Sequence, residues 1–188
     1  MSPASPTDPL PLPDGIHLRL MKASDMPDVR TLHANLLPTQ YPPAFFIQLL
    51  LHPRYLCLVA THEDAIVAFA SAVIEMSHCG ANLGDGTNTP AHVTLLTLGV
   101  KTAFRRRGIG RALVHAVARR LRALGSLSAE GMWRETKHST ILVRAEVAHS
   151  NTSGRCFYSC LGMNEESVSH LDIKLTTRTQ LVAGLLSV

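Results

Sequence analysis

The order of apolar and polar residues along the chain predicts a succession of strands and helices. Five segments are strongly apolar or alternate with a period of two, as strands do; they span residues 16–20, 55–61, 65–75, 92–100 and 141–147. The second and third flank a tight turn at Glu63-Asp64, which predicts an antiparallel hairpin. In the last segment Val143 and Ala145 fall on one face and Glu146 on the other, so this strand should have one buried and one polar face.

Four further segments have the pattern of helices, and they span about residues 25–36, 44–51, 109–124 and 151–161. Ser24 or Asp25 is the expected cap of the first. The third is amphipathic, because apolar residues recur at one helical spacing and basic residues at another; the apolar stripe is Val114, Val117, Leu121 and Leu124, and the basic one is Arg111, His115, Arg119 and Arg122. With a last strand in the poorly defined end of the chain, the resulting order, β-α-α-β-β-β-α-β-α-β, predicts a mixed, mostly antiparallel sheet flanked by helices in one α/β domain.

The segments without such patterns set the expected boundaries. Residues 1–15 contain five prolines and read as a flexible leader, so the domain should occupy residues 16–188. Residues 77–90 are rich in glycine and asparagine, which is typical of an exposed loop, and a second long loop is expected before residue 140. The end of the chain is poorly defined, although residues 180–188 would suit a strand or a helix.

Composition narrows the class of protein. With 188 residues, 46% hydrophobic and 17% charged, the chain is typical of one globular domain and not of a disordered protein. The net charge of +4 suits an anionic ligand but gives no reason to expect direct nucleic-acid binding. No apolar run is long enough for a membrane span, and the start does not resemble a secretory signal, so we expect a cytoplasmic or nuclear protein. The four cysteines form no zinc-finger pattern and are expected to be reduced thiols, with no metal site.

One stretch carries the chemistry: "RRRGIGRALV", from Arg105 to Val114, where three arginines precede Gly-x-Gly and an amphipathic helix. A dinucleotide fingerprint is disfavoured, because the third glycine of G-x-G-x-x-G is replaced by Leu113. A nucleic-acid patch is disfavoured because no aromatic residues surround the short basic run. A phosphate cradle fits best, because free N–H groups at the start of a helix and glycines that allow close approach both favour an anion. A turn with glycines for packing alone is the remaining alternative.

A family resemblance rests on this stretch together with a second one. "RRRGIG" resembles the R/Q-x-x-G-x-G/A signature of the GNAT (Gcn5-related N-acetyltransferase) superfamily. "NTSGRCFYSCLGM", residues 151–163, resembles the superfamily's N-x-x-A-x-x-x-Y-x-x-x-G-F segment, with Met163 in place of phenylalanine. Within the superfamily, "LPTQYPPAFF" and "LLTLGVKTAFRRRGIG" look most like the catalytic subunits of protein Nα-acetyltransferases of the San (NatE) and NatF types.

The resemblance implies acetyl-CoA as co-substrate, without a metal. Its pantetheine would pair with the edge of the strand at residues 98–100, and its pyrophosphate would bind the N–H groups of the turn. The implied cofactor-binding residues are Leu98, Gly99, Val100, Arg105, Arg106, Arg107, Gly108, Ile109, Gly110, Arg111 and Asn151.

The resemblance also implies direct transfer of acetyl to an amine. Glu146 is the candidate base and resembles the glutamate of bacterial ribosomal-protein acetyltransferases, and Tyr158 is the candidate acid toward the sulfur of CoA. San-type enzymes have histidine at the position of Glu146 and tyrosine at that of Thr94, so the catalytic pair departs from theirs. For Glu146 the alternative role is that of a solvated strand carboxylate, which could pair with Arg144, and for Tyr158 it is ordinary packing.

The acceptor is the least determined part. Tyr41, Thr94 and Leu96 are the implied acceptor-binding residues, which favours a protein or peptide N-terminal α-amine and allows an auxiliary subunit. The end of the chain, residues 164–188, lacks the tyrosine-rich hairpin loop of those enzymes and looks short for two strands. Two alternatives therefore stay open: an acetyltransferase for a small-molecule amine or a lysine side chain, and a non-catalytic subunit that binds acyl-CoA.

Overall fold

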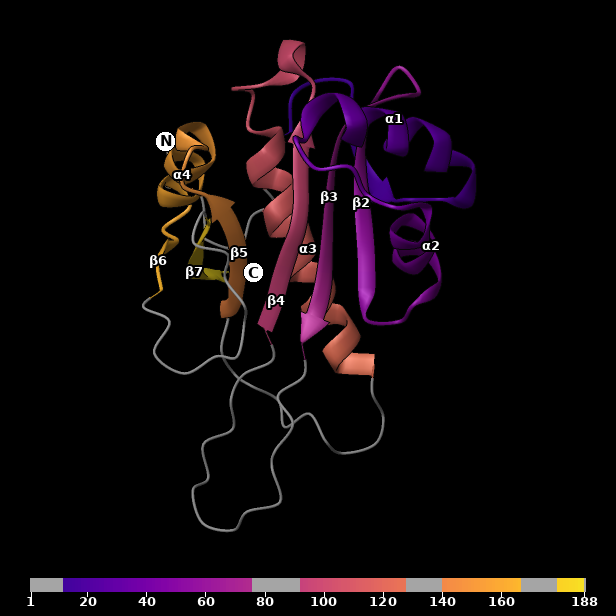
Figure 1. The fold of residues 1–188 in the computed structure, drawn as a ribbon. Helices are drawn as coiled ribbons and strands as arrows, with labels where there is room; N and C mark the ends of the chain where they lie inside the picture. The colour runs from indigo at the N-terminus through magenta and orange to yellow at the C-terminus, as the bar shows by residue number, and fades with distance from the viewer. Residues whose placement is uncertain (1–11, 76–91, 128–139, 167–178, 188) are drawn as a thin grey trace, which may run out of the picture.

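A computed structural model describes residues 12–75, 92–127, 140–166 and 179–187, with the side chains of residues 121–127, 140 and 187 excepted. These residues form a seven-stranded sheet with helices on both faces (Figure 1). The strands are β1 (Ile16–Leu20), β2 (Tyr55–His62), β3 (Ala65–Glu75), β4 (His92–Val100), β5 (Thr140–Ala148), β6 (Asn164–Glu165) and β7 (Thr179–Ser187). The helices are α1 (Met26–Leu36), α2 (Pro43–Leu51), α3 (Ile109–Leu127) and α4 (Thr152–Cys160), with 3₁₀ turns at Ala23–Asp25 and Thr102–Phe104.

The strand order is β1-β2-β3-β4-β5-β7-β6, and each described pairing is antiparallel except that of β4 with β5. The predicted mixed, mostly antiparallel sheet is therefore confirmed. The hairpin between β2 and β3 is also confirmed, because Glu63 and Asp64 have φ of 48° and 64°, the left-handed values that a two-residue type I′ turn requires.

The end of the chain differs from the prediction, which had one strand after the last helix. Two strands follow α4 instead: β6, which is two residues long, and β7, which pairs with β5 along its whole length. A two-residue strand of Asn164 and Glu165 has no alternation to recognise, and its pairing with β7 depends on distant residues. The predicted loop at residues 77–90 and most of the predicted leader lie outside the described residues.

Two apolar clusters hold the helices on the sheet. On one face α3 buries Leu113, Val114 and Val117 against strand residues such as Ala70 and Val143. The predicted apolar stripe is confirmed for Val114 and Val117, whereas the side chains of Leu121 and Leu124 lie outside the described part of the structure. On the opposite face α1 and α2 pack on β2 and β3 through a second cluster: Val29, Leu32, Phe46, Leu49, Val59 and Phe69. Figure 1 shows α1 and α2 on the near face and α3 behind the strands.

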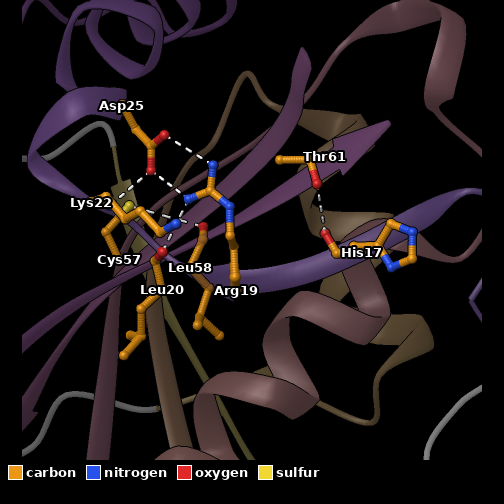
Figure 2. A network of polar contacts seen from close by, with 8 residues as sticks. All are labelled: His17, Arg19, Leu20, Lys22, Asp25, Cys57, Leu58 and Thr61. Carbon is orange, nitrogen blue, oxygen red and sulfur yellow. Dashed lines mark hydrogen bonds and ion pairs between the residues drawn. The ribbon is translucent and has the colours of Figure 1, made fainter. Parts of the chain in front are cut away.

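The start of α1 is fixed to β1 by a partly buried ion pair (Figure 2). The two guanidinium nitrogens of Arg19 donate to the carboxylate of Asp25 at 2.5 and 2.9 Å, and the backbone N–H of Lys22 donates to the same carboxylate at 2.7 Å. The hydrogen bond from Arg19 is the main cause that lowers the pKa of Asp25 below its usual value. Asp25 is the residue immediately before α1, where the sequence predicted the cap, but its carboxylate bonds to Arg19 and to the N–H of Lys22 and caps no N–H group of the helix.

Strand β4 contains an irregularity that prepares the site. Ser71 of β3 pairs with Thr97, whereas Ala72 pairs with Leu95, so Leu96 is an extra residue opposite β3. Before this bulge Val93 and Leu95 face the α3 cluster, and after it Leu98 and Val100 do so, while Leu96 packs with the α1–α2 cluster. The bulge therefore changes which side chains of β4 face each layer.

Candidate active site

The parallel pairing of β4 with β5 stops partway along both strands. The last paired residues are Leu95 and Ala145, although β4 continues to Val100 and β5 to Ala148. Figure 1 shows the two arrows apart at their tips. Beyond Leu95, no described strand pairs with the edge of β4 that faces β5. Residues 98–100, the predicted pantetheine-binding residues, therefore lie on an open strand edge.

The turn that follows β4 has the geometry of an anion site. Arg106 and Gly108 both have left-handed backbones, with φ of 63° and 80°, and alternation of this kind turns successive N–H groups toward one concavity. The first α-helical bond runs from the N–H of Ala112 to the carbonyl of Gly108, so the N–H groups of residues 109–111 precede it and need an acceptor from outside the helix. A Cβ on Gly108 would meet no atom within 4 Å, so the space above this backbone is open.

The arginines of this turn divide into two roles. The Nε of Arg105 donates to the carbonyl of Val100 at 2.9 Å and so ties the turn to the end of β4. The guanidinium of Arg107 lies over the ring of Phe104, 5.4 Å from its centroid. The side chains of residues 105–107 and 111 are exposed, and in the described part of the chain none of them makes an ion pair. Their charge is thus available to a ligand at the turn.

Helix α4 packs beside this turn and carries the second motif. Its cap is Asn151, whose side-chain oxygen accepts from the N–H of Gly154 at 2.9 Å. Phe157 lies against Gly110, where a Cβ would stand 3.3 Å from its ring. Tyr158 is buried, and burial raises the pKa of its hydroxyl to about 12, so this hydroxyl stays protonated and can donate.

The carboxylate of Glu146 lies at the exposed end of β5, beyond the last residue paired with β4. It accepts a hydrogen bond from the hydroxyl of Thr179 on β7. The alternative partner, Arg144, is not engaged with it: Arg144 instead makes a two-pronged ion pair with Glu166, at 3.1 and 3.0 Å. The suggested pairing of Glu146 with Arg144 is therefore wrong, because β5 and the segment after β6 place Glu166 against the guanidinium.

Tyr41 connects the acceptor side to this carboxylate. It lies between α1 and α2 and contacts the rings of His33 and Phe45, with centroids 5.5 and 4.5 Å away. Burial and, second, the negative charge of Glu146 raise the pKa of the Tyr41 hydroxyl. The two predicted site residues are therefore within electrostatic range of each other, whereas Glu146 and Tyr158 share no hydrogen bond among the described residues.

Sequence reasoning missed two groups on this side of the sheet. Thr94 donates to the carboxylate of Glu75 at 2.8 Å, and His92 is bonded to the other oxygen of that carboxylate at 2.8 Å. His33 is buried, stacks on Phe69 at 3.8 Å and has a pKa lowered to about 4 by burial. No local motif marks Glu75 or His33, since both are brought to the site by strand register and helix packing.

The site as a whole is an anion-binding turn beside an open strand edge, with a carboxylate and a protonated tyrosine from neighbouring elements. The described residues contain no cluster of three or more metal-ligating side chains. No helix among them is both long and apolar enough to cross a membrane. Such a site, on a sheet whose strands β4 and β5 separate, suits an enzyme that binds a phosphorylated ligand beside groups able to take up and donate protons.

Comparison with known proteins agrees with this class. The family model of the Acetyltransferase (GNAT) family matches residues 26–132, more than half of the chain, so the chain belongs to this family. Membership confirms the predicted superfamily and the predicted N-acetyltransferase that uses acetyl-CoA as co-substrate. No curated protein matches the sequence.

Solved structures share the fold at low sequence identity. NAA60 from Arabidopsis thaliana, in complex with acetyl-CoA, has a TM-score of 0.67 and 19% identity, covering 91% of this chain and 98% of that one. The ribosomal-protein-S18-alanine N-acetyltransferase from Escherichia coli has 0.61 and 20%, covering 92% and 95%. The aminoglycoside 6'-N-acetyltransferase AAC(6')-Ih from Acinetobacter baumannii has 0.58 and 19%, covering 86% and 100%. The fold is thus common to enzymes named for protein acceptors and for aminoglycosides.

Proposed function

We propose that this enzyme transfers the acetyl group of acetyl-CoA to the N-terminal α-amine of a protein or peptide. The observation that carries the proposal is the placement of Tyr41, packed on His33 and Phe45 between α1 and α2, on the side of the sheet where the exposed carboxylate of Glu146 extends beyond the β4–β5 pairing. It joins the loop expected to form the acceptor wall to the carboxylate expected to act as base. One of the similar structures, the ribosomal-protein-S18-alanine N-acetyltransferase, is named for a protein acceptor, which supports the same acceptor class.

The turn after β4 fits the diphosphate of the co-substrate. The N–H groups of residues 106–110, the open space above Gly108 and the unpaired arginines together supply directed donors and positive charge. Leu98, Gly99 and Val100 would offer the strand edge to the pantetheine arm, as the pairing with β5 ends before them. Asn151 lies at the start of α4, whose Phe157 packs on the same turn, and would contact the co-substrate from that side.

The bound thioester would supply the acetyl group, and two side chains would handle the protons. Glu146 would take a proton from the acceptor ammonium, directly or through water, so that the amine nitrogen can attack the carbonyl carbon. Tyr158 would donate a proton to the departing sulfur. Its pKa of about 12 keeps the hydroxyl protonated before the reaction, so it can donate a hydrogen bond and its proton as negative charge develops on the sulfur.

The test is a thiol-release assay against a library of peptides that differ in their first residues. Glu146→Gln and Tyr158→Phe should each lower kcat by about 100-fold, the lower end of what general acid–base groups contribute. Acetyl-CoA affinity should be unchanged in Glu146→Gln, because this carboxylate lies away from the phosphate turn. Glu165→Gln is the matched control, an exposed carboxylate that pairs with Arg155. Full turnover in both variants would overturn the assigned chemistry.

A second candidate keeps the chemistry and changes the acceptor to a small-molecule amine or a lysine side chain. The observation that favours it is Thr94, a short side chain at the position where San-type enzymes have tyrosine, together with the structural likeness to an aminoglycoside acetyltransferase. Free lysine, polyamines and aminoglycosides belong in the same assay. A non-catalytic subunit would bind acetyl-CoA and release no thiol with any of these amines.

A further inference from the structure

Glu75 is a carboxylate at the acceptor side that the proposed mechanism does not use. It ends β3, and its side chain is 45% exposed. Thr94 donates to one of its oxygens and His92 Nε2 donates to the other, both at 2.8 Å. A carboxylate accepts about four hydrogen bonds, so two of its acceptor sites remain for solvent or a ligand.

Glu75 and Glu146 lie on the same face of the sheet. On β3 the preceding residue, Ile74, is buried in the α3 cluster, so Glu75 points to the opposite face. On β5 Ala145 and Val147 are buried in that cluster, so Glu146 points to the same opposite face. Thr94 lies there too, because its neighbours Val93 and Leu95 belong to the α3 cluster. Glu75 and Glu146 are thus two carboxylates on the face that carries Tyr41.

The separation of the two carboxylates follows from the register. Thr94 is in register with Arg144, two residues before Glu146 on the adjacent strand. With about 3.3 Å per residue and about 4.8 Å between strands, the Cα atoms of Thr94 and Glu146 are about 8 Å apart. Since the carboxylate of Glu75 is held at the hydroxyl of Thr94, it lies on the order of 10 Å from that of Glu146.

The nearest described cation on this face does not neutralise Glu75. Arg144 is in register with Thr94, but its guanidinium is held by both oxygens of Glu166, and its side chain is only 15% exposed. Glu75 instead has a hydroxyl and an imidazole as partners. The negative charge of Glu75 is therefore available to an acceptor molecule that binds beside Thr94.

We propose that Glu75 is a specificity-determining residue that binds a second positive charge of the acceptor, about 10 Å from the nitrogen that is acetylated. The inference rests on the proposed function, because it takes Glu146 as the position of that nitrogen. An extended peptide advances about 3.3–3.6 Å per residue, so a basic side chain at the second or third position reaches this distance. The acceptor class is thus a peptide with a basic residue next to its N-terminus.

The experiment compares peptides that carry arginine or citrulline at position two or three, because citrulline has nearly the shape of arginine without the charge. Arginine also excludes acetylation of the side chain. Peptide binding to the enzyme with CoA present, and thiol release with acetyl-CoA, are measured separately. The parent enzyme should prefer arginine at one of these positions by about fivefold, through KM and Kd and not through kcat, as a partly exposed ion pair allows.

Glu75→Gln should remove this preference, and Glu75→Asp should restore part of it. The matched control is Glu165→Gln, which should keep the preference, because Glu165 lies on β6 and pairs with Arg155. Equal binding of both peptides to the parent, or a preference that survives Glu75→Gln, overturns the inference. A lower kcat for every peptide in Glu75→Gln also overturns it, since that result assigns Glu75 to proton transfer. Failure of the proposed function is distinct: it is the absence of thiol release despite peptide binding.

Discussion

At the scale of single residues, the most unusual side chain is His33 of α1. It is buried among aromatic rings, stacked on Phe69 at 3.8 Å and edge-on to Tyr41 and Phe46. Its Nε2 is 3.5 Å from the hydroxyl of Thr97, and its Nδ1 has no hydrogen-bond partner among the described residues. Such surroundings favour the neutral imidazole, which is why its pKa falls to about 4.

This burial predicts a specific loss of stability in acid. His33 is neutral in the fold down to about pH 4, but it takes up a proton near pH 6.5 when the chain is unfolded. The contribution of the neutral His33 to the free energy of unfolding is therefore fully present above pH 6.5. It is lost as the pH falls toward 4, by about 2–3 kcal/mol at pH 4.5. The measurement is urea unfolding of the parent and His33→Phe at pH 7.5 and 4.5.

Because the other histidines titrate in both proteins, the difference between the parent and His33→Phe isolates the contribution of His33. The stability of His33→Phe should fall less than that of the parent between the two pH values. Parallel losses in the two proteins would contradict the assignment of a neutral, buried imidazole. A measured titration of the His33 imidazole near pH 6.5 in the folded enzyme would do the same.

At the scale of elements, β4 has an open backbone edge beyond Leu95 and also packs against aromatic side chains of the α1–α2 cluster. Its bulge at Leu96 places Gly99 over the ring of Phe69, the same ring on which His33 stacks. A Cβ on Gly99 would stand 2.5 Å from Phe69 Cζ and 3.2 Å from Leu36 Cδ1. Glycine is therefore required here by close approach of α1 and β3, and not only by a ligand at the strand edge.

Gly99→Ala should accordingly destabilise the enzyme by about 1–3 kcal/mol, as overpacking of a filled core does. Phe69 has no exposed surface and its ring stacks on that of His33, so it has little room to move away from the added methyl group. Urea unfolding of Gly99→Ala, Phe69→Leu and the double variant measures this directly. The smaller leucine should relieve the clash, so the double variant should lose less stability than the two single changes together. Strict additivity would mean that Phe69 is not what the methyl group meets.

At this scale too, the local sequence predicts some features of the structure and not others. The turn from Arg105 to Arg111 and the start of α1 at Asp25 were predictable, because tight turns and helix starts depend on residues close together in the chain. Strand β6 and the contact of Glu75 with Thr94 were not. Both depend on register between segments far apart in sequence, which local periodicity does not specify.

At the scale of the whole molecule, the charges are separated along the chain. Residues 92–127 contain eight basic residues and no acidic one, whereas the rest has ten basic and fourteen acidic residues. The net charge of +4 thus understates the positive field around the phosphate turn and α3. On the outward side of α3, Arg111 and Arg120 are exposed, and neither makes an ion pair with another described residue. We infer that this field attracts the phosphates of acetyl-CoA before contact is made.

Arg120 offers a test of this long-range attraction without touching the site. It follows Ile109 by eleven residues on α3, which at 1.5 Å per residue is about 16 Å from the phosphate turn. That distance is within the screening length of about 30 Å at 0.01 M salt and beyond the length of about 8 Å at 0.15 M. Arg120→Gln should therefore slow association of acetyl-CoA at the lower ionic strength, leave it unchanged at the higher one, and leave dissociation unchanged at both, as measured by stopped-flow kinetics. Arg54→Gln changes the net charge equally, but Arg54 precedes β2 at the opposite end of the sheet, so its effect at low salt should be smaller. A loss of affinity in Arg120→Gln that persists at 0.15 M would instead place Arg120 in contact with the co-substrate. Equal effects of the two variants would mean that net charge alone explains the attraction.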